Sequence, residues 1–209
     1  MKRVTGLHII LGSTDDEQAI ELAMLARKEG AAVVQLRDKV RGDAELLSLA
    51  RTLRAILDDV TFIINDRVDI AREVNADGVH LGQNDMPIAE ARALLGTDAI
   101  IGISTSNLQE ALEAERAGAN YLGFGHLFPT RSKMKESTPK TVEELRAVAA
   151  AVSIPVIAIG GITESNVNGI LIPGLGGIAV IGAVNESENP RKTIRNFVKM
   201  LEEHHAIHT

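Results

Sequence analysis

The sequence contains no cysteine and no tryptophan, and aromatic residues make up only 2% of its 209 residues. Without cysteine, a disulfide framework, a thiolate nucleophile and a zinc–thiolate site are all excluded. No apolar stretch approaches the roughly 20 residues that a membrane-spanning helix needs. Apolar residues still make up 45% of the sequence. The core must therefore consist of Ala, Val, Ile and Leu, which typically fill parallel sheets that are buried on both faces.

The formal net charge of −6 argues against non-specific binding to nucleic acid or to an anionic membrane, because both need a cationic surface. The basic start of the chain precedes an apolar run that contains Gly6 and His8 and lacks a cleavage pattern. This run therefore predicts a first strand and not a signal peptide. We expect a cytoplasmic protein whose partners are small molecules. The sequence leaves the oligomeric state open, a homo-oligomer included.

Strand-like and helix-like segments alternate along the whole chain. The predicted strands cover residues 7–11, 32–36, 61–64, 78–81, 99–103, 121–127, 155–159 and 178–181. The predicted helical segments cover residues 15–28, 43–57, 68–74, 87–95, 107–117, 141–152, 164–171 and 190–205, with Asp43, Asn107 and Thr141 as N-caps. Eight such units predict an α/β fold, a single-domain (β/α)8 TIM barrel over residues 1–209. A doubly wound open sheet is the alternative, but it concentrates its polar and glycine residues at one switch point, whereas here they follow nearly every strand.

Polar residues directly after the strands can be grouped, because in such a barrel all carboxyl ends of the strands face one site. The groups comprise Gln35, Arg37 and Lys39; Asn65 and Asp66; Gln83 and Asp85; Ser104; Thr130, Arg131, Ser132 and Lys133; Gly160 and Gly161; and Gly182. Asp66 and Asp85 suit a magnesium ion, which takes one or two protein carboxylates. Arg37, Lys39 and Lys133 would neutralise a diphosphate beside that ion. The glycine loops suit a second phosphate.

Simpler interpretations exist for the same residues. Asp66 and Asp85 would each serve as the N-cap of a helix beginning at Arg67 or Pro87. Residues 37–39 also fit an exposed turn. Joint placement at one barrel rim favours the functional interpretation, because independent caps do not require it.

Several segments closely resemble the thiamine phosphate synthase family, in order and over nearly the whole chain. They are residues 34–39, 64–71, 77–87, 102–104, 128–133 and 158–163. The resemblance implies a magnesium-dependent transferase that joins a pyrimidine methyl diphosphate to a thiazole phosphate and releases diphosphate. It implies that Gln35, Arg37, Lys39, Asn65, Ser104 and Lys133 hold the pyrimidine diphosphate, with Arg37, Lys39 and Lys133 as catalytic cations. Asp66 and Asp85 would bind magnesium, and Thr130, Ser132, Gly161, Ile181 and Gly182 the thiazole phosphate.

The chain departs from the family pattern at three places. His126 stands where a small residue or proline is usual, Gly182 where a serine is common, and residues 134–140 lack a usual glycine. A related branch that resembles TenI, the thiazole tautomerases, carries a similar histidine, which moves protons because its pKa lies near neutrality. A tautomerase that uses His126 is therefore the alternative function, and a non-catalytic regulator that binds thiazole or thiamine phosphates is a third. The intact pair Asp66 and Asp85 favours the synthase over both.

Overall fold

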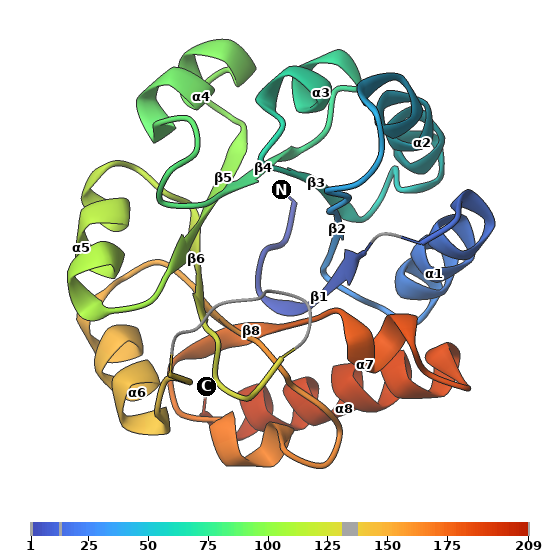
Figure 1. Cartoon of the computed structure of the whole chain (residues 1–209). Coiled ribbons are helices and arrows are strands. Elements are labelled where there is room, and N and C mark those ends of the chain that lie inside the picture. The colour runs from blue at the N-terminus through green and yellow to red at the C-terminus, as the bar shows by residue number, and fades with distance from the viewer. Residues whose placement is uncertain (1, 13, 131–137, 209) are drawn as a thin grey trace.

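The computed structural model describes residues 2–12, 14–130 and 138–208 and forms a closed barrel of eight parallel strands in chain order, ringed by helices (Figure 1). The strands are β1 (Gly6–Leu11), β2 (Val33–Leu36), β3 (Thr61–Asn65), β4 (Gly78–Leu81), β5 (Ile100–Thr105), β6 (Tyr121–Gly125), β7 (Val156–Ile159) and β8 (Leu175–Val180). The helices are α1 (Asp16–Lys28), α2 (Asp43–Ile56), α3 (Val68–Glu73), α4 (Ile88–Leu95), α5 (Leu108–Arg116), α6 (Val142–Ala151), α7 (Gly182–Asn185) and α8 (Pro190–His208). The predicted (β/α)8 barrel is confirmed, and the open-sheet alternative is wrong.

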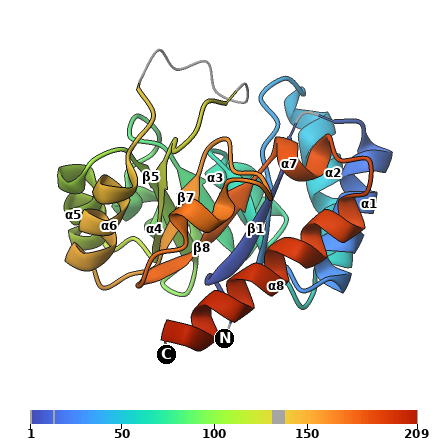
Figure 2. The ribbon, with the colours of Figure 1, turned by 90° about the horizontal axis from the view of Figure 1, so that it is seen from below.

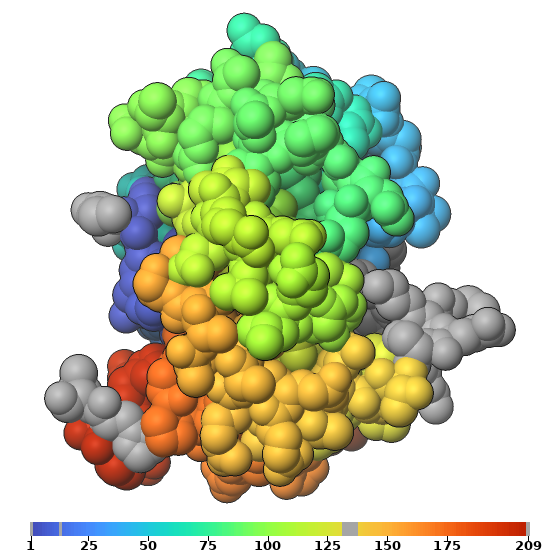
Figure 3. Space-filling view, turned by 90° about the vertical axis from the view of Figure 1, so that its left-hand side faces the viewer, coloured from blue at the N-terminus to red at the C-terminus, as the bar shows by residue number. Residues whose placement is uncertain are grey.

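The outer helices cover the barrel from all sides. Figure 3 shows the face on which α4, α5 and α6 follow one another. Figure 2 shows that the start of the chain and the end of α8 both lie at the same end of the barrel, away from the loops that follow the strands. None of the helices in the described ranges is both long enough and apolar enough to cross a bilayer.

Both faces of the sheet are apolar, as the composition predicts. Val34, Ile64 and Leu122 belong to the large cluster between the sheet and the helices. Their chain neighbours Val33 and Ile63 belong to a second cluster inside the barrel. This alternation explains why each strand reads as a continuous apolar run.

The single tyrosine, Tyr121, lies in the barrel interior. It is 1% exposed and packs with Ile10, Ile157 and Ala179. A Cβ atom at Gly102, on the neighbouring strand, would lie 2.1 Å from Cζ of Tyr121. Gly102 is therefore required for the ring to fit. The ring of His8 meets Tyr121 edge-on, with 5.3 Å between the centroids.

The helix starts confirm two of the three predicted N-caps. Thr141 forms a full capping box with Glu144, and the Asn107 side chain accepts a hydrogen bond from the Glu110 N–H. The prediction for Asp43 is wrong: Gly42 is the N-cap and makes no side-chain bond. Asp43 is already helical, and its carboxylate instead pairs with Arg67 at 2.5 Å.

The largest departures from prediction lie in the last third of the chain. The predicted helix over residues 164–171 is only a 3₁₀ turn, η1 (Val167–Ile170), since Gly169 and Pro173 disfavour a longer helix. β8 begins at Leu175, earlier than predicted, and contains two glycines. The second, Gly177, is needed there because a Cβ atom would lie 2.0 Å from the Gly6 carbonyl oxygen of β1. The short helix α7 was not predicted.

A testable consequence of the interior concerns the pH dependence of stability. Burial lowers the pKa of His8 from 6.5 to about 4, and its hydrogen bond to the Val4 carbonyl at 2.7 Å opposes this only in part. The unfolded chain therefore binds an extra proton between pH 6.5 and about 4, so the free energy of unfolding falls as the pH falls through that window. At roughly 1.4 kcal/mol per pH unit, the whole interval corresponds to about 3 kcal/mol.

His8→Gln, which keeps a donor but cannot titrate, should remove this component. Urea unfolding of both proteins from pH 7.5 to 4 measures it as the difference between the two pH profiles. Parallel profiles would show that His8 does not cause the loss.

Candidate active site

An ion pair joins the ends of β2 and β3 at the rim of the barrel. Lys39 Nζ lies 3.2 Å from Asp66 Oδ2. Asp66 directly follows β3 and has a φ of 61°, which is uncommon for a residue other than glycine but is tolerated by Asp and Asn. Its N–H donates to the carbonyl of His80 in β4 at 2.9 Å. Three consecutive strand ends thus meet at Asp66.

Asp85 lies on the next loop, after β4. Its Oδ2 accepts a hydrogen bond from the Gly82 N–H at 2.6 Å. Gly82 is two residues beyond His80, so both predicted metal ligands are anchored on the end of the same strand. Asp85 is exposed.

Neither carboxylate caps a helix. The N-cap of α3 is Arg67 and that of α4 is Pro87, and neither makes a side-chain capping bond. The simpler interpretation of Asp66 and Asp85 is therefore wrong. Lys39 is exposed, as a turn would make it, but its ammonium group contacts Asp66.

A chain of side-chain hydrogen bonds runs from this rim into the barrel interior. His80 Nε2 lies 2.9 Å from Ser104 Oγ, and His80 Nδ1 lies 3.0 Å from the Tyr121 hydroxyl. Burial raises the pKa of Tyr121, so its hydroxyl stays protonated. The Gln83 amide donates to the Ser104 carbonyl at 2.7 Å. Ser104 is therefore held from both sides by residues of β4 and its loop.

The other predicted diphosphate-binding residues lie beside these groups. Gln35 is 3% exposed on β2, in register with Ile10 and Ile63 of the barrel interior. Asn65 is half-buried and in register with His80. Arg37 is half-buried, and its N–H donates to the Leu11 carbonyl at 3.0 Å. Ser132 and Lys133 lie outside the described residues.

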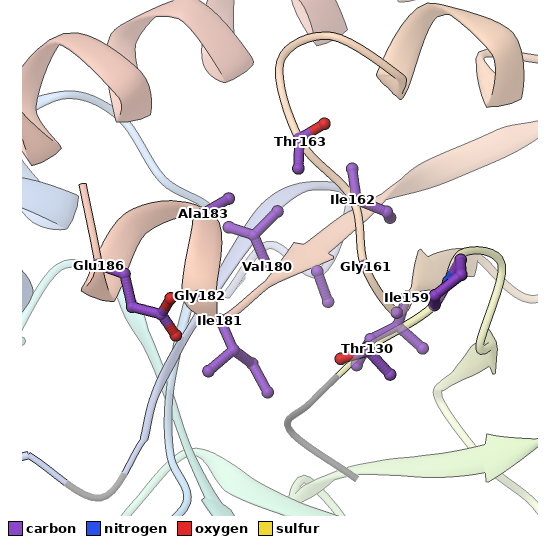
Figure 4. A pocket seen from close by; sticks show the side chains of 13 residues that line it. Thr130, Ile159, Gly161, Ile162, Thr163, Val180, Ile181, Gly182, Ala183 and Glu186 are labelled. Carbon is purple, nitrogen blue, oxygen red and sulfur yellow. The ribbon is translucent and has the colours of Figure 1, made fainter. Parts of the chain in front are cut away.

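A separate cavity of about 360 Å³ opens across the ends of β6, β7 and β8 (Figure 4). It is lined by Thr130, Gly160, Gly161, Ile181 and Gly182, among others. Gly161 has a φ of 63°, and a Cβ atom there would lie 2.4 Å from the Pro129 carbonyl oxygen. Only glycine fits this turn. All four described residues that were predicted for the second phosphate line this one cavity.

A side chain fixes the turn that forms the cavity wall. The Asn166 amide donates to the Gly161 carbonyl at 2.9 Å and its oxygen accepts from the Thr163 N–H at 2.8 Å. The glycine turn is thus held open by its own loop, with backbone groups facing the cavity.

Glu186 is an acidic residue of this cavity that the sequence did not single out. Figure 4 shows its carboxylate beside Gly182. A Cβ atom at Gly182 would lie 3.1 Å from Glu186 Oε1, so a serine at that position would crowd this carboxylate. Among the described residues that line the cavity none is basic. A phosphate here would therefore rest on N–H and hydroxyl donors.

His126 stands at the boundary between β6 and the glycine turn. A Cβ atom at Gly160 would lie 2.3 Å from Cβ of His126. The His126 carbonyl accepts from the Lys140 N–H at 2.7 Å. His126 is half-buried and is thus adjacent to the glycine-lined cavity. It does not belong to the Lys39–Asp66 group.

His80 is the site residue whose role is least evident from the sequence. Its position within a strand predicts only a hydrogen-bonded core or rim group. It occupies an inward position of β4, in register with Gly102 and Asn65. A polar residue on the inward face, directly before the strand ends, is the signal that identifies it as part of the rim.

The chemistry of the rim fits a magnesium ion. Among the described residues, no three His, Asp or Glu side chains converge into a protein-only metal cage. Magnesium rarely needs one, because it keeps several waters and uses one or two carboxylates plus substrate phosphates. Asp66 and Asp85, anchored on one strand end beside a lysine, are a donor set of this kind.

Comparisons with known proteins show the family to which the chain belongs. A family model described as thiamine monophosphate synthase matches residues 7–184. A thiamine-phosphate synthase from Chlorobium phaeobacteroides is 46% identical over 194 residues, which cover 90% of this chain and 94% of the relative. One from Methanobrevibacter smithii is 40% identical over 189 residues, covering 90% of each.

Solved structures give the same result. Thiamine phosphate pyrophosphorylase from Pyrococcus furiosus has a TM-score of 0.83 at 39% identity and covers 96% of both chains. A 3-hexulose-6-phosphate synthase, with a TM-score of 0.71 at 16% identity, shares the fold alone. With a matching family model over most of its length and relatives above 40% identity, the chain belongs to the thiamine monophosphate synthase family.

Proposed function

We propose that the protein is a cytoplasmic, magnesium-dependent thiamine phosphate synthase. It transfers the hydroxymethylpyrimidine moiety from its diphosphate to a thiazole phosphate and releases diphosphate. The observation that carries the proposal is the contact between Lys39 and Asp66 at 3.2 Å, which sets a cation for the diphosphate against a carboxylate for the metal. Family membership supports the reaction type.

In this reaction the bond between the methylene carbon and the diphosphate oxygen breaks, and the diphosphate leaves with the electron pair. The thiazole nitrogen then donates its lone pair to the methylene carbon. Asp66 and Asp85 would hold a magnesium ion, which would supply charge stabilisation for the departing diphosphate. Arg37, Lys39 and Lys133 contribute further positive charge to that group.

Ser104, Gln35 and Asn65 bind and orient the pyrimidine diphosphate. Ser104 suits this task because His80 and Gln83 fix its position before any substrate binds. Preorganised polar groups act without a reorganisation cost at the moment of reaction.

The thiazole phosphate binds in the glycine-lined cavity, on backbone groups of Gly161, Ile181 and Gly182 and on the hydroxyls of Thr130 and Ser132. This placement separates the two anionic groups, one at the ends of β2 to β5 and one at the ends of β6 to β8. The thiazole ring then lies between them, where its nitrogen can meet the methylene carbon.

The acidic pair provides a direct test. Asp66→Asn and Asp85→Asn should each lower kcat/KM at least about a hundredfold, as expected for a group that acts on leaving-group charge. Asn is the informative replacement at position 66 because it tolerates the left-handed backbone, and at position 85 because its oxygen can still accept the Gly82 N–H. Thiamine phosphate formation with and without magnesium measures the effect, and calorimetry with magnesium and diphosphate measures binding.

Asp69→Asn is the matched control. Asp69 is three residues from Asp66 and is exposed, and its carboxylate pairs with Arg67 at 2.6 Å, an interaction that lowers its pKa. This variant should keep near-normal turnover. Activity in Asp66→Asn or Asp85→Asn at the level of Asp69→Asn would contradict the proposed metal site.

His126 decides between synthase and tautomerase. We expect His126→Ala to retain thiamine phosphate synthesis within about tenfold of the wild type, because loss of a true general acid–base typically costs about a hundredfold or more. The measurement is synthase turnover beside proton exchange on a thiazole carboxylate. The tautomerase would be established instead if the wild-type protein had no synthase activity and its proton exchange on the thiazole carboxylate disappeared in His126→Ala.

A further inference from the structure

The loop between β2 and α2 holds a carboxylate that the proposed chemistry does not use. Asp38 lies between Arg37 and Lys39, and its side chain is only 2% exposed. Its Oδ1 accepts from the N–H groups of Val40 and Arg41, at 2.9 and 3.1 Å. Its Oδ2 accepts from Arg41 Nε at 2.9 Å. A buried carboxylate is normally costly, and here these bonds compensate it.

Arg41 also links this loop to a second segment of the rim. Its guanidinium donates to the Thr14 carbonyl and pairs with the Asp16 carboxylate. Thr14 belongs to the connection from β1 to α1 and Asp16 is the first residue of α1, so one guanidinium joins the β2–α2 loop to the neighbouring β1–α1 segment. The Arg41 side chain is 17% exposed, so solvent weakens its pair with the buried Asp38 less than it weakens a pair on the open surface.

Attraction for a diphosphate gives no reason for an acid at this position. A carboxylate one residue away from both Arg37 and Lys39 weakens their attraction for a diphosphate. Its use must therefore be geometric: bonds from Asp38 to the two following N–H groups form the loop into a turn. An unconstrained loop would lose conformational freedom when the ligand binds, and a preformed one does not.

We propose that Asp38 and Arg41 are positioning residues, which hold the β2–α2 loop in the conformation that presents Arg37 and Lys39 to the pyrimidine diphosphate. The proposal rests on the proposed synthase function for the identity of the substrate. It requires of Asp38 and Arg41 no contact with the substrate.

Two variants separate geometry from charge. Asp38→Asn removes a negative charge near the diphosphate and replaces the acceptor of Arg41 Nε by an amide NH2 group. Charge alone therefore predicts tighter binding, whereas loss of the Asp38–Arg41 side-chain bond predicts weaker binding. Arg41→Lys keeps the charge but loses the fork that reaches Asp38 and Thr14 together. For both we expect a higher KM for the pyrimidine diphosphate, by about tenfold, below the roughly hundredfold that a misplacement of about 1 Å can cause. The KM for the thiazole phosphate should stay within about twofold.

Asp77→Asn is the matched control for a purely structural effect. Asp77 Oδ2 also accepts from a backbone N–H, that of Phe62 at 2.8 Å, and from a guanidinium, that of Arg54 at 2.9 Å. It lies just before β4, at the opposite end of the barrel. This variant should lower the melting temperature without raising the KM for the pyrimidine diphosphate.

Inorganic diphosphate with magnesium, titrated by calorimetry, gives a readout that does not depend on turnover. If the wild type binds it but forms no thiamine phosphate, the proposed function fails, while weaker binding to Asp38→Asn still supports positioning. Unchanged or tighter diphosphate binding in Asp38→Asn overturns the proposal, as does an equal rise in KM in Asp77→Asn. If Asp38→Asn does not fold, Arg41→Lys decides on the same criteria.

Discussion

Closure of the parallel sheet is the constraint on which the rest of the structure depends. Each strand has one face against the helices and one against the barrel interior, so apolar residues must fill both. Val33 and Val34 are neighbours in β2, yet one belongs to the inner cluster and the other to the outer one. Polar side chains are therefore largely restricted to the strand ends, and all carboxyl ends of the strands meet at one rim. The gathering of Arg, Lys, Asp and Ser at that rim follows from burial as well as from chemistry.

The polar exceptions inside the barrel show how the core reaches the site. A buried hydroxyl is costly unless it is hydrogen-bonded, and the Tyr121 hydroxyl meets His80 at 3.0 Å. His80 in turn meets Ser104 at 2.9 Å. Tyr121 fits only because Gly102 has no side chain. The packing of Tyr121 against Gly102 therefore fixes the orientation of the His80 imidazole on β4. That imidazole in turn fixes the Ser104 hydroxyl at the rim.

The barrel could be predicted from the sequence because apolar strands alternate with helices at a regular spacing. Its rim residues could be grouped for the same reason, since parallel strands bring their ends together. Pairwise contacts could not be predicted, because nothing in the local sequence indicates that Asp66 pairs with Lys39 instead of capping α3. The sequence predicts a start of β8 that is too late because glycine disfavours strands locally, whereas Gly177 is required by the close approach of Gly6 on β1. Non-local contacts decided every one of these positions.

The two ends of the rim differ in charge, and this difference bears on how two anionic substrates are told apart. At the β2 to β4 end, Arg37 and Lys39 are balanced by Asp66 and Asp85, so these four side chains carry no net charge. A diphosphate gains strong attraction there only when a divalent cation accompanies it. The glycine-lined cavity contains the acidic residue Glu186, and among the described residues that line it there is no basic side chain. It offers N–H dipoles, which suit a single phosphate and need no metal. With the proposed magnesium site, dependence on the metal would belong to one substrate and not to the other, and this would keep each anion at its own end of the rim.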